Sequence, residues 1–180
     1  ASDATATQPH GRQAKGPMKT LLVLRHAKSD WGDERLRDYD RPLNARGYRA
    51  APRMGRLIVD ERIVPDVIAT STATRARDTA DLVAEAAGYA GDVRGHDTLY
   101  DAAPSAYIQV LRGLSDEVAT AMVVGHNPGV ERLVAGLTGT DVHMTTANLA
   151  RIALDVDAWE AVAMSGAGEL VTLWRPKDLS

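Results

Sequence analysis

The sequence predicts an α/β domain of three layers, α/β/α, in which helices cover both faces of a mostly parallel central sheet. Three short runs rich in branched apolar residues read as buried strands, at residues 20–24, 67–70 and 120–124. Each run is followed by a stretch in which apolar residues recur every three or four positions, as on one face of a helix. Strands that alternate with helices favour parallel pairing, because the helix returns the chain to the starting edge of the sheet.

The chain length fits one such domain. It has 180 residues, of which 44% are hydrophobic, enough to enclose one core and short for two. Residues 1–17 are polar and interrupted by Gly and Pro. We expect a disordered leader there, either native or left by cloning, followed by a single domain at residues 18–180.

Composition argues against several classes of protein. The formal net charge is −3, so we expect neither nucleic acid nor a membrane surface as a partner. The chain has no Cys, which excludes a disulfide scaffold, a thiolate nucleophile and a cysteine zinc site. The sequence contains no run near the roughly 18 apolar residues of a membrane span and no signal peptide pattern, so we expect a cytoplasmic protein.

The first strand leads into a charged, aperiodic segment at residues 28–41, which is typical of a loop bordering a functional site. Trp31 and Tyr39 within it are expected to pack the loop onto the domain. Asn44 is expected to cap the helix that follows. Pro52 should kink that helix or delay its start, because proline lacks the N–H of a helical turn.

The second helix should be capped by Ser71 or Thr72, run to about Ala87 and end at Gly88. Its small apolar residues fall on one stripe, which allows close packing on the sheet. The remaining elements are expected to be a strand at 93–99, a helix at 104–114, a helix at 130–137, and strands at 149–154 and 170–174.

Polar residues suited to bind an anion follow all three buried strands. Arg25 and His26 come after the first strand, Arg75 shortly after the second, and His126 after the third. Arg25 and His26 alone would fit a surface loop equally well. Because the carboxyl ends of parallel strands share one edge of a sheet, however, the four groups are expected to converge on one crevice. Two histidines and two arginines around one site suit a phosphoryl group.

Arginine is well suited to such a site, because its planar guanidinium meets phosphate oxygens in pairs. We expect Arg75, rather than Arg77, to bind the phosphate. Arg77 shares its helix face with Asp81 and fits an exposed ion pair.

Two further residues are expected to assist anion binding. Lys28 would extend the positive field beyond His26. Asn127 as N-cap, with Pro128 at the first helical position, would direct the N-terminus of the next helix at the phosphate.

In the absence of cysteine, the nucleophile is either an imidazole or a metal-bound water. A metal ion is less favoured, because Arg25 and Arg75 would repel a dication and the sequence has no HxH or HExxH spacing. We therefore expect no metal and no cofactor. A histidine that attacks phosphorus in line, while arginines neutralise the equatorial oxygens, fits better.

Four ordered motifs carry a resemblance to a known family. They are Leu24-Arg25-His26-Ala27-Lys28-Ser29, Arg41-Pro42-Leu43-Asn44, Ser71-Thr72-Ala73-Thr74-Arg75-Ala76 and Gly125-His126-Asn127-Pro128. With them the chain resembles the histidine phosphatase superfamily, branch 1, and within it the SixA-type phosphohistidine phosphatases. The resemblance extends from Lys19 to the end of the chain.

The resemblance implies the phosphoglycerate mutase-like fold of that superfamily and a covalent phosphohistidine intermediate on His26, with no cofactor. It also implies that Arg25, Arg75 and His126 hold the phosphate, and that Arg41 reaches in from its loop.

The sequence departs from the superfamily pattern at two positions. Ala27 follows the nucleophile where Gly is common, a replacement that SixA-type members share. Phosphoglycerate mutase-like members carry a Glu as proton donor, and the corresponding stretch here is Leu99-Tyr100-Asp101, which makes Asp101 the candidate general acid. SixA-type members resemble one another in lacking a fixed carboxylate there.

This acid position bears on the substrate. A leaving imidazole, with a pKa of about 6.5, needs less protonation than a leaving alkoxide. The favoured function is therefore the dephosphorylation of phosphohistidine in a partner protein. Two alternatives stay open: hydrolysis of a small phosphomonoester with Asp101 as general acid, and a phosphoprotein-binding module without turnover.

Overall fold

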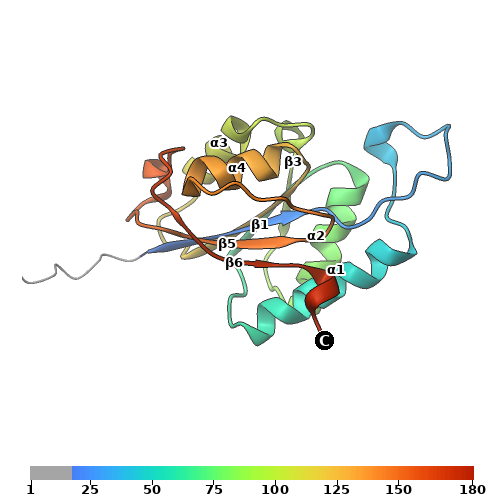
Figure 1. The fold of residues 1–180 in the computed structure, drawn as a ribbon, viewed down its shortest axis with the longest axis horizontal. Helices are drawn as coiled ribbons and strands as arrows, with labels where there is room; N and C mark the ends of the chain where they lie inside the picture. Colours follow the sequence, from blue (N-terminus) through green and yellow to red (C-terminus); the bar gives the residue numbers. More distant parts are fainter. Residues whose placement is uncertain (1–17) are drawn as a thin grey trace, which may run out of the picture.

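A six-stranded sheet lies between two pairs of helices in the computed structural model (Figure 1). The structure describes residues 18–180, so the expected leader lies outside the described residues. Helices α3 (Pro104–Arg112) and α4 (Gly129–Thr138) cover one face of the sheet. Helices α1 (Ala45–Asp60) and α2 (Thr74–Ala87) cover the other face. The predicted three-layer α/β/α architecture is confirmed.

The sheet is mostly parallel, as predicted. Its strands are β1 (Lys19–Arg25), β2 (Val67–Ser71), β3 (Val93–His96), β4 (Thr120–Gly125), β5 (Leu149–Leu154) and β6 (Glu169–Trp174). They lie in the order β3-β2-β4-β1-β5-β6, with the first four parallel and with β5 and β6 added by antiparallel pairing. Arg25 pairs with Gly125 across β1 and β4. The carboxyl ends of these strands therefore meet at one edge of the sheet.

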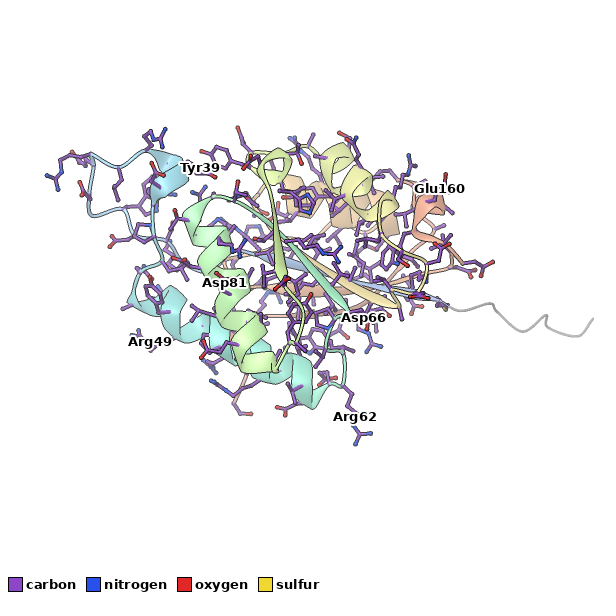
Figure 2. The ribbon with its side chains drawn as sticks, turned by 180° about the vertical axis from the view of Figure 1, so that it is seen from behind. Tyr39, Arg49, Arg62, Asp66, Asp81 and Glu160 are labelled. Carbon is purple, nitrogen blue, oxygen red and sulfur yellow. The ribbon has the colours of Figure 1, made fainter. Side chains whose placement is uncertain are left out.

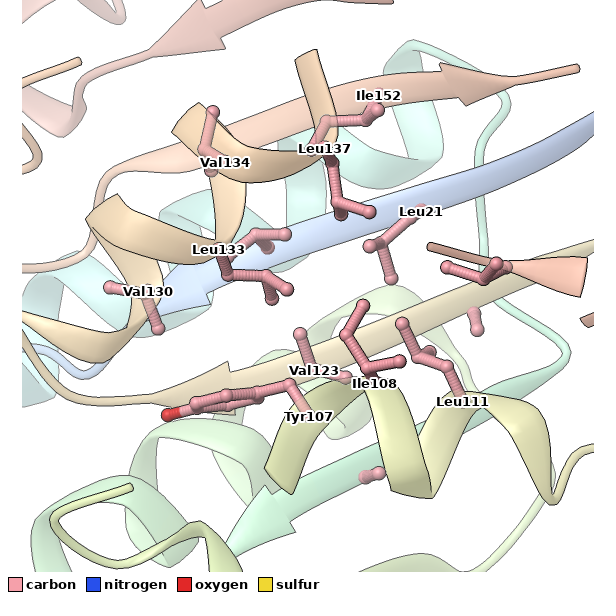
Figure 3. Packing of buried hydrophobic residues seen from close by; sticks show 14 of the residues in the cluster. Leu21, Tyr107, Ile108, Leu111, Val123, Val130, Leu133, Val134, Leu137 and Ile152 are labelled. Carbon is pink, nitrogen blue, oxygen red and sulfur yellow. The ribbon is translucent and has the colours of Figure 1, made fainter. Parts of the chain in front are cut away.

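The apolar run of β1 is buried on both faces of the sheet because successive side chains point to opposite sides. Leu21 and Val23 join the core under α3 and α4, which Figure 3 shows from close by. Leu22 and Leu24 join the core under α1 and α2. This double burial explains why the run is continuous rather than alternating, and it holds β1 in the middle of the domain.

Helix α1 begins where the sequence predicts. The Asn44 side chain accepts a hydrogen bond from the Gly47 N–H at 3.0 Å, as an N-cap does. Pro52 lies inside the helix, and the helix runs without a break from Ala45. The prediction that Pro52 delays the start is therefore wrong, because the cap at Asn44 sets the first turn.

Helix α2 begins differently from the prediction. Its N-cap is Ala73, which has no side-chain oxygen to offer, whereas Ser71 is the last residue of β2. The Ser71 hydroxyl accepts a bond from the Ala73 N–H at 3.2 Å and also contacts His126. At the other end Gly88 terminates the helix with a φ of 64°, a left-handed conformation that suits glycine.

Short 3₁₀ helices complete the described part of the chain. They are η1 (Asp38–Asp40), η2 (Asp97–Leu99), η3 (Trp159–Ala161) and η4 (Pro176–Asp178). The second of these takes up the final residues of the strand predicted at 93–99, so β3 is shorter than expected. Among residues 18–180, no helix combines the length and the apolar character needed to cross a bilayer.

Candidate active site

The structure brings the predicted site residues together at the carboxyl edge of the sheet. His26 directly follows β1, His126 directly follows β4, and Arg75 lies in the first turn of α2. The rings of His26 and His126 have their centroids 5.2 Å apart. His26, Arg75 and His126 are each no more than 7% exposed, although all three are polar. Buried polar groups in such a cluster indicate a functional site rather than a packing solution.

His26 is held in one tautomer by the backbone. Its Nδ1 lies 2.7 Å from the carbonyl oxygen of Ala27, and a carbonyl oxygen only accepts hydrogen bonds. Nδ1 therefore carries the proton, and Nε2 keeps its lone pair. Burial is the largest of the effects that lower the pKa of His26, which falls to about 3. The imidazole is thus neutral near pH 7, the form that attacks phosphorus.

The backbone after His26 is hydrogen-bonded to α2. The Ala27 N–H donates to Thr79 Oγ1 at 2.9 Å, and the Thr79 hydroxyl donates to the Arg75 carbonyl oxygen at 2.6 Å. Ala27 itself is fully buried. This chain of two hydrogen bonds connects the residue after His26 with the turn that carries Arg75.

His126 is oriented by Ser71, a residue that the sequence predicts as a cap of α2. Its Nε2 lies 2.8 Å from Ser71 Oγ, and its backbone N–H faces the Tyr107 hydroxyl at 3.4 Å. Burial first, and then the charge of Arg75, lower the pKa of His126 to about 4. Ser71 is expected from its position to cap α2, and only the sheet register places its hydroxyl against His126.

The loop at residues 28–41 brings Arg41 to the site, as the family resemblance implies. Its guanidinium is buried and stacks on the Trp31 ring, with the central carbon 3.4 Å from the ring centroid. Trp31 is 69% exposed, so the expectation that it packs the loop onto the domain is wrong.

Tyr39, which is labelled in Figure 2, lies in η1 near the end of this segment. Its ring packs edge to face on the ring of Tyr100, with the two centroids 5.1 Å apart.

Asp38 is a site residue that the sequence did not reveal. Its carboxylate accepts from Arg75 Nη2 at 3.0 Å, from Arg41 Nε at 3.2 Å and from the Tyr100 hydroxyl at 2.7 Å. The charged loop holds several other acidic residues, and nothing in the pattern distinguishes Asp38 from them.

Four buried nitrogens of the predicted residues have no hydrogen-bond partner within the described part of the chain. They are Arg25 Nε, Arg41 Nη1, Arg75 Nε and His126 Nδ1. A buried polar group without a partner costs roughly 1–3 kcal/mol, and more when it is charged. Three guanidinium groups with such nitrogens beside a neutral imidazole fit an anion with several acceptor oxygens, such as a phosphoryl group.

Asn127 has a different role from the predicted one. The cap position of α4 is Pro128, and the helix begins at Gly129. The Asn127 side-chain nitrogen donates to Glu131 Oε1 and to the Met144 carbonyl oxygen, each at 2.9 Å. The prediction that it caps the helix is wrong, because its side chain instead ties the start of α4 to the segment before β5.

The two remaining candidates lie at the surface. Lys28 is exposed next to the site. Asp101 is exposed and has a φ of 48°, and its side chain makes no hydrogen bond or ion pair within residues 18–180. Its neighbour Tyr100 faces the site instead, with its ring centroid 5.7 Å from that of His126.

Residues 18–180 contain no group of three or more His, Cys, Asp or Glu placed to hold a metal ion.

Comparison with known proteins agrees with this geometry. Residues 21–104 match the family described as the histidine phosphatase superfamily (branch 1). An uncharacterized chloroplastic protein of Arabidopsis thaliana is 31% identical over 160 residues, which cover 83% of this chain and 73% of that protein.

Two solved structures share the fold over nearly their whole length. A candidate phosphohistidine phosphatase SixA from Agrobacterium tumefaciens has a TM-score of 0.74 at 29% identity, covering 88% of this chain and 98% of its own. A candidate phosphohistidine phosphatase SixA from Nakamurella multipartitia has a TM-score of 0.76 at 26% identity, and the match covers 91% of this chain and 99% of that one. The family match begins in β1 and spans His26 and Arg75, and the two solved structures share the fold over most of this chain, so the chain belongs to the histidine phosphatase superfamily, branch 1.

Proposed function

We propose that this protein is a cofactor-independent phosphatase that removes the phosphoryl group from phosphohistidine on a partner protein. The observation that carries the proposal is the state of His26. Its Nδ1 proton is held by the Ala27 carbonyl oxygen at 2.7 Å, so Nε2 offers a lone pair, and the positive charges of Arg75 and Arg25 act on the same ring. A neutral nucleophile among fixed cationic donors suits in-line transfer of a phosphoryl group.

The reaction has two balanced steps. In the first, the Nε2–P bond forms on His26 while the P–N bond of the substrate breaks, and the released imidazole takes a proton from solvent. In the second, water attacks phosphorus, the Nε2–P bond breaks, and inorganic phosphate and a proton leave. The arginines stabilise the charge on the equatorial oxygens in both steps.

The proposed substrate class is supported by the environment of His26, where no carboxyl group among residues 18–180 is placed as a strong proton donor. Asp101 is exposed and engages none of the site residues. The carboxylate nearest the arginines is Asp38, and although burial raises its pKa, the hydrogen bond from Tyr100 and the charges of Arg75 and Arg41 lower it overall. Such a carboxylate is a poor proton donor. A leaving imidazole, with a solution pKa of about 6.5, needs such help far less than an alkoxide.

A trapping and competition experiment tests this proposal. The protein is mixed with a ³²P-phosphohistidine protein, and acid-labile label on the enzyme is measured together with released phosphate. We expect label on the wild type and none on His26→Ala, with His96→Gln as the control, because His96 lies outside the site at the end of β3. Turnover that survives in His26→Ala would remove the covalent mechanism, and binding without any label would favour a non-catalytic module.

The same experiment separates the two substrate classes. Turnover of p-nitrophenyl phosphate and of a sugar phosphate is measured beside that of the phosphohistidine protein. If an ester reacts faster, the protein-substrate part of the proposal fails. Asp101→Asn then decides the alternative, since a general acid is worth roughly 10² to 10⁴ in rate for an ester.

A further inference from the structure

One carboxylate connects three side chains from separate parts of the fold. Asp38 lies in η1 and accepts hydrogen bonds from Arg75 in α2, from Arg41 at the end of its own loop and from Tyr100 beyond η2. A second contact to Arg41, from Nη2 to Oδ1, measures 3.1 Å. The Asp38 backbone carbonyl oxygen also accepts from Arg75 Nη1 at 2.7 Å. The side-chain carboxylate and the backbone carbonyl oxygen of Asp38 therefore both bind the Arg75 guanidinium.

These contacts determine which nitrogens of the arginines stay available. Arg75 uses both terminal nitrogens on Asp38, and Arg41 uses Nε and Nη2. The nitrogens left over, Nε of Arg75 and Nη1 of Arg41, are buried and have no partner among the described residues. Because a guanidinium is planar, fixing two of its nitrogens also fixes the direction of the third.

The exposure of the side chains places Asp38 on the outer side of the arginines. Its side chain is 50% exposed, whereas those of Arg41 and Arg75 are 8% and 7% exposed. His26 is as buried as the two arginines, at 7% exposed. The carboxylate thus lies on the side of the arginines that faces solvent, while the free nitrogens are buried.

We propose that Asp38 is a positioning residue of the phosphoryl site, which orients Arg41 and Arg75 so that their free nitrogens meet the phosphoryl oxygens. Asp38 stays bound to both arginines while the anion occupies the interior. The inference rests on the proposed function only in taking this cluster to be an anion site. Long arginine side chains lose conformational freedom when they bind a ligand, and a carboxylate that already holds them reduces that loss.

The opposite role would be competition, in which the carboxylate takes the place of the phosphoryl group and must be displaced. The two roles predict opposite effects of removing the charge. By electrostatics alone, an anion site binds more tightly when a neighbouring negative charge is removed. If Asp38 positions the arginines, its removal weakens anion binding although the site becomes more positive.

Binding of orthovanadate, measured by isothermal titration calorimetry, distinguishes these roles without any need for turnover. We expect Asp38→Asn to weaken vanadate binding about tenfold or more, in the range of a lost pair of charge-assisted hydrogen bonds. Asp40→Asn is the matched control, since Asp40 lies in the same turn and, among residues 18–180, its side chain pairs only with the exposed Arg37. We expect it to change the affinity less than about twofold, as is usual for an exposed pair.

A double-mutant cycle adds a measurement that a general loss of structure would not reproduce. If Asp38 acts through Arg41, then Asp38→Asn should cost much less in an Arg41→Ala background than in the wild type. Tyr100→Phe removes one donor to the carboxylate and should weaken vanadate binding by a smaller factor. It serves as the test if Asp38→Asn does not fold.

Two results would overturn the inference: vanadate binding to Asp38→Asn that equals or exceeds the wild type, and equal costs of Asp38→Asn in the two backgrounds. Failure of the wild type to bind vanadate would instead refute the anion site itself. A wild-type protein that binds vanadate but does not hydrolyse phosphohistidine would refute the proposed substrate. The inference about Asp38 would not be affected by that outcome.

Discussion

The imidazole rings of His26 and His126 lie with their centroids 5.2 Å apart and their planes inclined at 52°. They follow two adjacent parallel strands whose last residues, Arg25 and Gly125, are paired in the sheet. Burial, followed by smaller effects that include neighbouring positive charge, lowers the pKa of both rings, to about 3 and about 4. The two rings therefore act as neutral groups at neutral pH, one with a free lone pair and one held by Ser71.

This pairing predicts the protonation state of both rings in solution. In ¹⁵N-detected NMR at pH 5.5, His26 and His126 should be neutral, and His26 should carry its proton on Nδ1, because the Ala27 carbonyl oxygen accepts it. In urea, where the burial is lost, both should titrate at about 6.5. A native-state midpoint near that value for His26 would contradict the structure.

The same shifts predict how stability depends on pH. The unfolded chain binds protons on both histidines below about pH 6.5, whereas the folded chain binds them only near pH 3 to 4, so stability is lost as the pH falls through this window. By pH 5 the loss should be about 2 kcal/mol for each histidine, at 1.36 kcal/mol per pH unit. Urea unfolding at pH 7 and pH 5 measures it.

The control for that experiment is the double variant His26→Gln and His126→Gln, in which neither position titrates. Its free energy of unfolding should change much less between the two pH values than that of the wild type. Equal slopes for the two proteins would show that other groups cause the acid sensitivity.

The stacking of Arg41 on Trp31 predicts a contribution of an exposed tryptophan to anion affinity. A cation–π contact at an exposed site is worth about 0.5–1 kcal/mol. Trp31→Ala should therefore weaken vanadate binding by roughly two- to fivefold, and Trp31→Phe by less, because a smaller ring remains. Leu36→Ala, another exposed apolar residue of the same loop, is the control and should bind as the wild type does. Identical affinities for Trp31→Ala and the wild type would rule out this role.

The close approach of Gly125 to Tyr107 predicts that the end of β4 tolerates no side chain. A methyl group at Gly125 would collide with the buried Tyr107 hydroxyl, and its distance to the ring carbon that bears this hydroxyl would be 2.8 Å. Figure 3 shows Tyr107 on α3 with its hydroxyl directed toward the end of the strand. Gly125→Ala should cost about 1–3 kcal/mol of stability by overpacking. Its activity should fall further, because His126 is the next residue.

Gly113→Ala supplies the comparison for this substitution. A methyl group there would lie 3.5 Å from the nearest atom, an ordinary contact. In measurements of thermal unfolding and turnover, Gly125→Ala should be less stable and less active than Gly113→Ala. A Gly125→Ala protein as stable and active as Gly113→Ala would show that Tyr107 moves aside freely.

Much of the fold is predictable from local pattern. Continuous apolar runs indicate strands buried on both faces, and Asn44 and Gly88 mark helix ends through their own side-chain or backbone preferences. Other helix starts are not predictable in this way. Ser71 and Asn127 are good capping residues by type, but their polar atoms are taken by His126, by Glu131 and by the Met144 carbonyl oxygen. A distant partner that forms a better hydrogen bond outweighs the local preference.

Sequence pattern alone predicts the three-layer architecture and the edge of the sheet at which His26, Arg75 and His126 meet, because parallel pairing follows from the alternation of apolar runs and helices. The contacts of Asp38 with the arginines, the orientation of His126 by Ser71 and the stacking of Arg41 on Trp31 become visible only in the folded chain. Those contacts join segments that local pattern does not relate. Their geometry depends on where a charged loop without periodicity comes to rest, and the packing of the whole domain sets that position.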